Sequence, residues 1–138
     1  MRDFRQIAAW QKAHRFTLAA CKACESFPAT ERFGLVRQIA RAAASIGSNI
    51  AEGCGRGGDA ELCRFFQIAM GSACEVEYQL LLARDLGYLN SAEHSKLQED
   101  ISEVQRMLAA FIRKLRADIR EHSSRFVLND LTQERANR

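Results

Sequence analysis

The chain contains 138 residues, of which 47% are hydrophobic and 27% charged, and its formal net charge is +3. This composition is that of one globular domain and excludes a disordered or collagen-like chain. No apolar run is long enough to span a membrane and no secretory signal opens the sequence, so we expect a cytoplasmic protein whose five cysteines stay reduced.

A first helix is predicted over residues 4–26, because apolar residues recur there every three or four positions. Its expected core stripe consists of Ile7, Trp10, His14, Leu18 and Cys21. Pro28 ends the helix, since proline disfavours the helical conformation of the residue before it. Cys21 and Cys24 have the C-x-x-C spacing of redox and metal sites, but no strand and no second pair of ligands accompany them. The sequence therefore predicts neither a metal nor a cofactor.

A second helix is predicted from about residue 31 to residue 52, followed by a turn through the glycines of 53–58. Three stripes run along this helix at helical spacing. The apolar stripe contains Leu35, Ile39, Ala42, Ala43, Ile46 and Ile50, the small-residue stripe contains Ala40, Ala44, Gly47 and Ala51, and the polar stripe contains Gln38, Arg41, Ser45, Asn49 and Glu52.

The polar stripe and the glycines after it do not match a phosphate loop or a catalytic cluster. A P-loop requires a preceding strand and a lysine after the glycines, and the sequence provides neither. No histidine is placed to act as a base beside Ser45, so we assign no catalytic residues and expect a protein that is not an enzyme. We interpret the stripe as a packing device in which Asn49 hydrogen-bonds into the bundle, with Gly71, Ser72 and Glu75 as its neighbours.

A third helix is predicted from Asp59, as its N-cap, to about residue 86, with Gly87 as a left-handed C-terminal cap. Its core stripe contains Leu62, Phe65, Ala69, Ser72, Val76, Leu80 and Ala83. A second apolar stripe lies nearly opposite and contains Cys63, Met70, Cys74, Tyr78 and Leu81. Because a single bundle would leave the second stripe in water, we expect other copies of the chain to cover it. The alternative is a set of separate surface hydrophobics, which are common.

A fourth helix is predicted from residue 90 or 91 to residue 122. Its single apolar stripe contains Leu97, Ile101, Val104, Leu108, Phe111, Ile112, Leu115 and Ile119. Residues 123–138 lose this periodicity and are predicted to form a weakly structured C-terminal tail. Residues 1–122 are then an all-α, antiparallel, up-down-up-down four-helix bundle, because short links between long helices make neighbours antiparallel.

Charge is distributed unevenly along the chain. Residues 59–103 carry three Lys/Arg and nine Asp/Glu, whereas residues 104–138 carry eight and four. The candidate nucleic-acid-binding cations lie on the first and fourth helices and are Arg5, Lys12, Arg15, Arg106, Arg113, Lys114, Arg116 and Arg120. Such side chains neutralise phosphates and make binding depend on salt. A solvated helix face is the alternative, because Glu99, Glu103 and Glu121 lie among these cations.

One long motif resembles the hallmark of the four helix bundle protein family, also called the 23S rRNA intervening-sequence proteins. It reads Gln38-Ile39-x-Arg41-Ala42-Ala43-x-Ser45-Ile46-x-x-Asn49-Ile50-Ala51-Glu52-Gly53-x-Gly55-Arg56. Supporting segments are WQKA at 10–13, FP at 27–28, ERFGL at 31–35, Ala69-x-Gly71-Ser72-x-x-Glu75 and LGYL at 86–89. The resemblance as a whole covers roughly residues 4–120. It implies a small bacterial cytoplasmic protein that assembles as a ring-like homopentamer and has no established catalytic residues.

The resemblance also implies partners. Some relatives are encoded within insertions of ribosomal RNA genes, and others are accessory proteins of diversity-generating retroelements that engage nucleic acid and a reverse transcriptase through a basic surface. Ala40 stands where relatives often have a second arginine, which weakens the case for a basic patch on this segment.

Two functions follow from these observations. The first is a non-enzymatic oligomeric scaffold that associates with structured RNA or DNA through a basic surface. The second is a protein-only assembly or accessory module that binds a partner protein such as a reverse transcriptase, with the tail around Phe126, Val127 and Leu128 as its docking segment. In both, packing and assembly are assigned to Ala44, Ser45, Gly47, Asn49, Glu52, Cys63, Met70, Gly71, Ser72, Cys74, Glu75 and Leu81.

Overall fold

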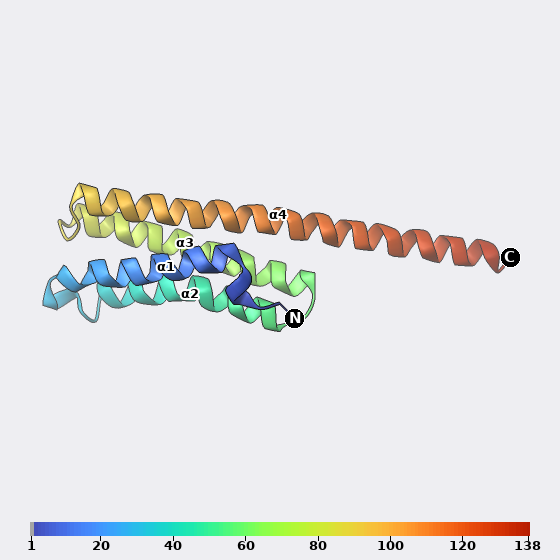
Figure 1. Ribbon diagram of the computed structural model, residues 1–138, viewed down its shortest axis with the longest axis horizontal. Helices are drawn as coiled ribbons and strands as arrows, with labels where there is room; N and C mark the ends of the chain where they lie inside the picture. Colours follow the sequence, from blue (N-terminus) through green and yellow to red (C-terminus); the bar gives the residue numbers. More distant parts are fainter. Residues whose placement is uncertain (1) are drawn as a thin grey trace.

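The computed structural model describes residues 2–138, which form four antiparallel helices and contain no strand (Figure 1). The helices are α1 (Ala8–Ala23), α2 (Leu35–Gly55), α3 (Asp59–Asp85) and α4 (Ser91–Ala136), with 3₁₀ turns at Phe4–Gln6, Cys24–Ser26 and Ala29–Glu31. α1 and α3 each pack against α2 and α4. The expected four-helix bundle is therefore confirmed. Within the described residues, no helix combines the length and apolar character needed to cross a membrane.

Local sequence signals account for most of the helix ends. Gly87 adopts a left-handed conformation (φ +83°), and the amide of Tyr88 donates to the carbonyl of Ala83, which closes the last turn of α3 as predicted. α4 begins with a capping box in which Asn90 and Glu93 each accept from the other's backbone amide.

The N-cap predicted for α3 is wrong by one residue. Gly58 occupies the cap position, with φ at +125°, and Asp59 is the first helical residue. The Asp59 side chain pairs instead with Arg2 at 3.7 Å. A carboxylate in the first turn still suits the positive end of the helix.

The core face of α1 differs from the predicted stripe. The buried residues are Ala9, Ala13, Phe16 and Ala20, whereas Leu18 is 59% exposed and Cys21 is exposed. The three alanines let α1 lie close to its neighbours, and Phe16 supplies the volume. Large apolar side chains dominate the hydrophobic pattern of this segment, and small alanines contribute little to it, so the pattern does not reveal the alanine face.

The predicted core stripes of α2 and α4 are confirmed, since Ile39, Ile46, Ile50, Ile101 and Leu108 are all fully buried. The predicted end of α2 is wrong, because the helix continues through Gly53 to Gly55. A Cβ atom at Gly53 would lie only 2.8 Å from the Cβ of Phe65. Gly53 therefore allows α2 and α3 to approach closely, and the turn itself uses the left-handed glycines at 57 and 58.

The C-terminal tail, which was expected to be weakly structured, is helical. α4 continues without interruption to Ala136 and projects well beyond the other three helices (Figure 1). No glycine or proline follows Gly87 in the sequence, so nothing ends the helix. Every residue from 120 to 138 is exposed, including Phe126 at 63%. The tail is a helix without a partner in the monomer.

Removing residues 123–138 is therefore expected to leave the free energy of unfolding of the bundle unchanged within about 0.5 kcal/mol. The deleted side chains are exposed, so they contribute little burial. Thermal unfolding followed by circular dichroism, with full-length chain as reference, tests this. A drop in Tm of many degrees would show that the projecting helix is packed against something in solution.

Candidate nucleic-acid interface

Four exposed arginines line one side of α4. Arg106, Arg113 and Arg120 recur every seven residues, and Arg116 follows Arg113 by three positions, so all four share one broad face. Between residues 104 and 120 the only acidic residue is Asp118. Within residues 2–138 no carboxylate forms an ion pair with these four arginines. We call them the α4 arginine face; its guanidinium groups are free to meet phosphates.

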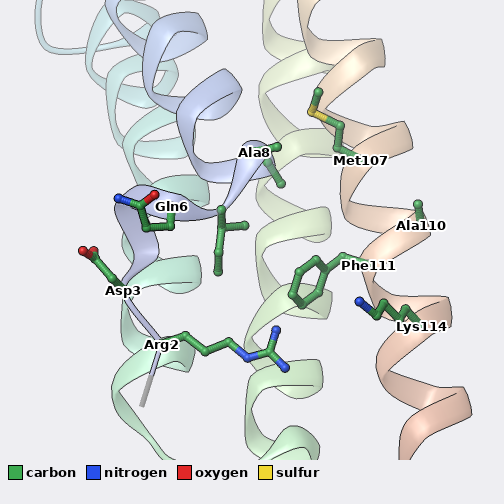
Figure 2. A pocket seen from close by; sticks show the side chains of 10 residues that line it. Arg2, Asp3, Gln6, Ala8, Met107, Ala110, Phe111 and Lys114 are labelled. Atoms are coloured by element: carbon green, nitrogen blue, oxygen red, sulfur yellow. The ribbon is translucent and has the colours of Figure 1, made fainter.

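Lys114 lies on a different side of α4, beside a groove. The groove has a volume of about 720 Å³ and runs between the N-terminal segment and α4 (Figure 2). Its apolar lining includes Ile7, Met107 and Phe111, and the guanidinium of Arg2 lies 5.5 Å from the Phe111 ring centre. Lys114 and Arg2 therefore form the cationic rim of an apolar groove, separate from the α4 arginine face.

Lys12 does not belong to a free basic surface, contrary to the sequence prediction. Its ammonium group lies 3.3 Å from Asp100 and 3.1 Å from Glu103, and only 18% of its side chain is exposed. The hydrogen bond to Glu103 is the main reason why the pKa of Lys12 is raised. Lys12 thus joins α1 to α4, and its charge is neutralised within the bundle.

Asp100 is the centre of this cluster, because it also pairs with Lys96 at 2.9 Å. Burial acts to raise the pKa of Asp100, but the hydrogen bonds from Lys96 and Lys12 outweigh it and leave the pKa below its ordinary value. A carboxyl whose pKa is lowered by folding stabilises the fold above its unfolded pKa. That stabilisation is lost as the pH falls through the lowered value.

Asp100→Asn is expected to lower the free energy of unfolding at pH 7 by about 2 kcal/mol, because it removes charged hydrogen bonds to Lys12 and Lys96. The difference from wild type should begin to shrink as the pH falls below about 4, the ordinary pKa of an aspartate, and should disappear as the pH falls through the lowered pKa of Asp100 in the folded chain. Urea unfolding at several pH values measures this difference. Glu99→Gln, an exposed neighbour, is the control and should show no such dependence; an unchanged difference at acid pH would contradict the assignment.

The two remaining cations of the N-terminal part are exposed. Arg5 pairs with Asp3 at 3.4 Å and stacks over the Phe4 ring at 4.5 Å. Arg15 lies on α1. The eight predicted cations are therefore divided: four form the α4 arginine face, Lys114 lines the groove, Lys12 is neutralised, and Arg5 and Arg15 lie on or beside α1.

The polar stripe of α2 packs as a helix-to-helix contact. The hydroxyl groups of Ser45 and Ser72 lie 2.9 Å apart and join α2 to α3. Contrary to the prediction, Asn49 does not hydrogen-bond to α3. Its amide donates to the carbonyl and the hydroxyl of Ser45, at 2.8 and 3.0 Å. Asn49 thereby orients the serine that makes the contact.

A polar notch of about 290 Å³ opens beside this contact and is lined by Gln38, Arg41, Ala42, Ser45 and Glu75. Glu75 also accepts a hydrogen bond from the buried Gln79 at 3.2 Å. Glu52 points elsewhere and pairs with Arg56 at 2.9 Å. The notch brings together three of the polar residues of the motif, Gln38, Arg41 and Ser45.

The second apolar stripe predicted for α3 is only partly exposed. Cys63 is buried and Met70 packs against the core, so these two belong to the bundle interior. Cys74, Tyr78 and Leu81 remain exposed, together with Ile68 and Gly71. We call these five residues the outer face of α3. On α2, Ala44 is exposed, whereas Gly47 lies under the indole of Trp10, whose Nε1 would be 3.2 Å from an added Cβ.

The thiols show no arrangement for chemistry. All five cysteines are free, and no cluster of His, Cys, Asp or Glu within residues 2–138 is arranged to hold a metal ion. Burial, followed by the nearby Cys21, raises the pKa of the Cys24 thiol to about 11. Cys24 is therefore protonated at neutral pH and is a poor nucleophile.

The four helices of the bundle carry the motif residues on α2, where Ser45 contacts Ser72 of α3. The profile of the 23S rRNA-intervening sequence protein family matches residues 5–110. The chain belongs to this family. A crystal structure of a protein of the S23 ribosomal protein family from Bacteroides thetaiotaomicron, whose function is unknown, is similar with a TM-score of 0.69 and 25% identity. The similarity covers 76% of this chain and 98% of that one. No curated protein matches the chain.

This member of the 23S rRNA-intervening sequence protein family carries its projecting helix outside the matched region, since the match ends at residue 110. Most of the α4 arginine face also lies beyond residue 110. The sequence does not indicate the groove at Phe111. It also does not indicate that the rings of Trp10 and His14 stack, with their centroids 4.9 Å apart. The spacing of four between Trp10 and His14 was the available signal, because residues four apart are neighbours on a helix.

Proposed function

We propose that the chain is a non-enzymatic, oligomeric scaffold that associates with structured nucleic acid through the α4 arginine face. The observation that carries this proposal is the set of four exposed arginines, none of them paired with a carboxylate of residues 2–138. Unpaired guanidinium groups on one face of a rigid helix can each meet a phosphate and release its counterions. Membership of a family named for 23S rRNA supports the choice of RNA.

The test compares binding of a stable RNA hairpin by wild type and by Arg113→Glu/Arg120→Glu. The double reversal should weaken binding at least 10-fold, roughly, because two attractive contacts become repulsive. Arg32→Glu/Arg37→Glu makes the same change in net charge on exposed residues elsewhere and is the matched control. An equal loss of RNA affinity in both variants would show that only net charge matters and would refute binding through the α4 arginine face.

Assembly into a ring of identical copies, a pentamer by resemblance, is part of the proposal. Its support is the outer face of α3, where Ile68, Tyr78 and Leu81 are 40%, 62% and 38% exposed. Apolar side chains gathered on one helix face favour contact with another protein surface. Multi-angle light scattering at micromolar concentration measures the mass, and a strict monomer would exclude the ring.

A protein-only accessory module is the second candidate function. The projecting end of α4 favours it, because Phe126, Val127, Leu128 and Leu131 are all more than half exposed there. A helix that exposes several large apolar side chains can lie in a groove of a partner such as a reverse transcriptase. Co-purification with such a partner after nuclease treatment, lost on removal of residues 123–138, would favour this function over the nucleic-acid scaffold.

A further inference from the structure

Three aromatic rings form a ladder that begins in the N-terminal segment and continues along α1. The rings of Phe4 and Trp10 meet edge to face with centroids 4.9 Å apart. The rings of Trp10 and His14 are stacked, with centroids 4.9 Å apart and planes only 8° from parallel. We call these three residues the aromatic ladder. His14 ends the ladder and is exposed to solvent.

Packing explains only part of this ladder. Phe4 and Trp10 are half-buried and lie against the core, so they fix the N-terminal segment to the bundle. His14 is exposed and forms no hydrogen bond with residues 2–138, yet its ring is stacked flat on the indole. The neighbouring side of α2 is built of small residues, and Gly47 lies directly under Trp10. The ladder therefore ends in a ring that solvent can reach.

One cationic side chain lies beside the Phe4 end of the ladder, and another exposed cation follows His14 in the sequence. The Arg5 guanidinium lies 4.5 Å from the centre of the Phe4 ring, and the exposed Arg15 directly follows His14. A hollow of about 500 Å³ adjoins Phe4 and is lined by Arg2, Asp3, Phe4, Arg5, Ala51 and Gly55. Asp3, which pairs with Arg5 at 3.4 Å, is the only acidic residue between residues 2 and 22.

We propose that the aromatic ladder binds unpaired nucleobases of a single-stranded segment, with one base stacked on His14 and the adjoining phosphates near Arg5 and Arg15. Every base has a π-face, and stacking on an accessible aromatic ring beside cations is the common way in which proteins hold single strands. An exposed ring on a helix that also carries an exposed arginine suits a base and its phosphate better than an apolar protein surface. The inference rests on the proposed function, to which it adds a second contact on a different helix.

The experiment uses the full chain and a fluorescein-labelled oligoadenylate of about 12 nucleotides, with a duplex RNA of the same length as the comparison. Anisotropy gives the affinities. Trp10 is the only tryptophan, so quenching of its fluorescence reports binding at the ladder. The variants are His14→Ala, which removes the accessible ring, and His14→Phe, which keeps one. Because His14 is exposed, both variants should keep the fold, which circular dichroism checks.

The expected result is that oligoadenylate quenches Trp10, that His14→Ala weakens oligoadenylate binding roughly 5- to 100-fold, and that His14→Phe restores it. Duplex affinity should not change in either variant. Equal effects of His14→Ala on both RNAs, or no effect on either, would overturn the ladder proposal. A change in the mass of the assembled protein in His14→Ala, with unchanged affinity for oligoadenylate, would also overturn the ladder proposal. That result would identify the ladder as a protein interface.

The two proposals fail in distinguishable ways. If Arg113→Glu/Arg120→Glu weakens duplex binding while His14→Ala leaves the affinity for oligoadenylate unchanged, only the ladder proposal is wrong. If His14→Ala weakens oligoadenylate binding while Arg113→Glu/Arg120→Glu leaves duplex binding unchanged, the ladder proposal is supported and binding through the α4 arginine face is refuted. If the wild-type chain binds neither RNA, both proposals are refuted.

Discussion

Replacing Phe66 by alanine is expected to lower the free energy of unfolding by about 3–5 kcal/mol and the Tm by roughly 10–20 °C. Phe66 is fully buried on α3, and its ring stacks on Phe111 of α4 with centroids 4.5 Å apart. Removing the ring loses apolar burial and leaves a cavity between two long helices that cannot collapse easily. Urea unfolding monitored by circular dichroism measures the change.

Phe126→Ala is the matched control for this loss. It deletes the same ring from an exposed position on the projecting part of α4, so it should change the free energy of unfolding by less than about 0.5 kcal/mol. Should Phe66→Ala fail to fold, Phe66→Leu gives the same comparison with a smaller volume change. Similar effects at positions 66 and 126 would mean that the projecting helix is buried as deeply as the core.

Gly53→Ala is expected to destabilise the bundle by about 1–2 kcal/mol, although alanine is the better helix former. The added Cβ would lie 2.8 Å from the Cβ of Phe65 and 3.2 Å from a methyl group of Leu62. Both neighbours are buried on α3, so α2 and α3 would have to move apart. Thermal and urea unfolding measure the effect.

Gly55→Ala makes the identical change two residues later, where no atom lies within 4 Å of the added Cβ. It should leave stability unchanged or raise it by about 0.5 kcal/mol, because alanine restricts the unfolded chain. The contrast between the two variants isolates the close approach of the helices from the effect of helix propensity. If both substitutions stabilise the protein equally, Gly53 is not a packing glycine.

The fold was predictable where one pattern dominated the sequence. The stripes of α2 and α4 consist of large aliphatic residues at helical spacing, and residues such as Ile46 and Leu108 are buried as expected. The buried face of α1 differs from the predicted stripe because alanine carries little hydrophobic signal, whereas Trp10 and Leu18 carry much. The end of α4 differs from the prediction because residues 123–138 lack an apolar stripe but contain no helix breaker, so they stay helical.

The candidate site was less predictable, because it depends on which residues meet in space. Lys12 and Asp100 are 88 positions apart, and nothing local indicates that they pair. The α4 arginine face was found from spacing alone, since residues seven apart share a helix face. Trp10 and His14 are four positions apart and are therefore neighbours on a helix, but the predicted core stripe includes both, whereas the His14 ring is exposed.

The salt dependence of RNA-hairpin binding tests the central proposal most directly. If four arginines of α4 each neutralise a phosphate, the logarithm of the association constant should fall against the logarithm of salt concentration with a slope of about −3 to −4. In Arg113→Glu/Arg120→Glu the slope should become shallower by about 2. A slope near zero, or a steep slope that the double reversal leaves unchanged, would contradict binding through the α4 arginine face.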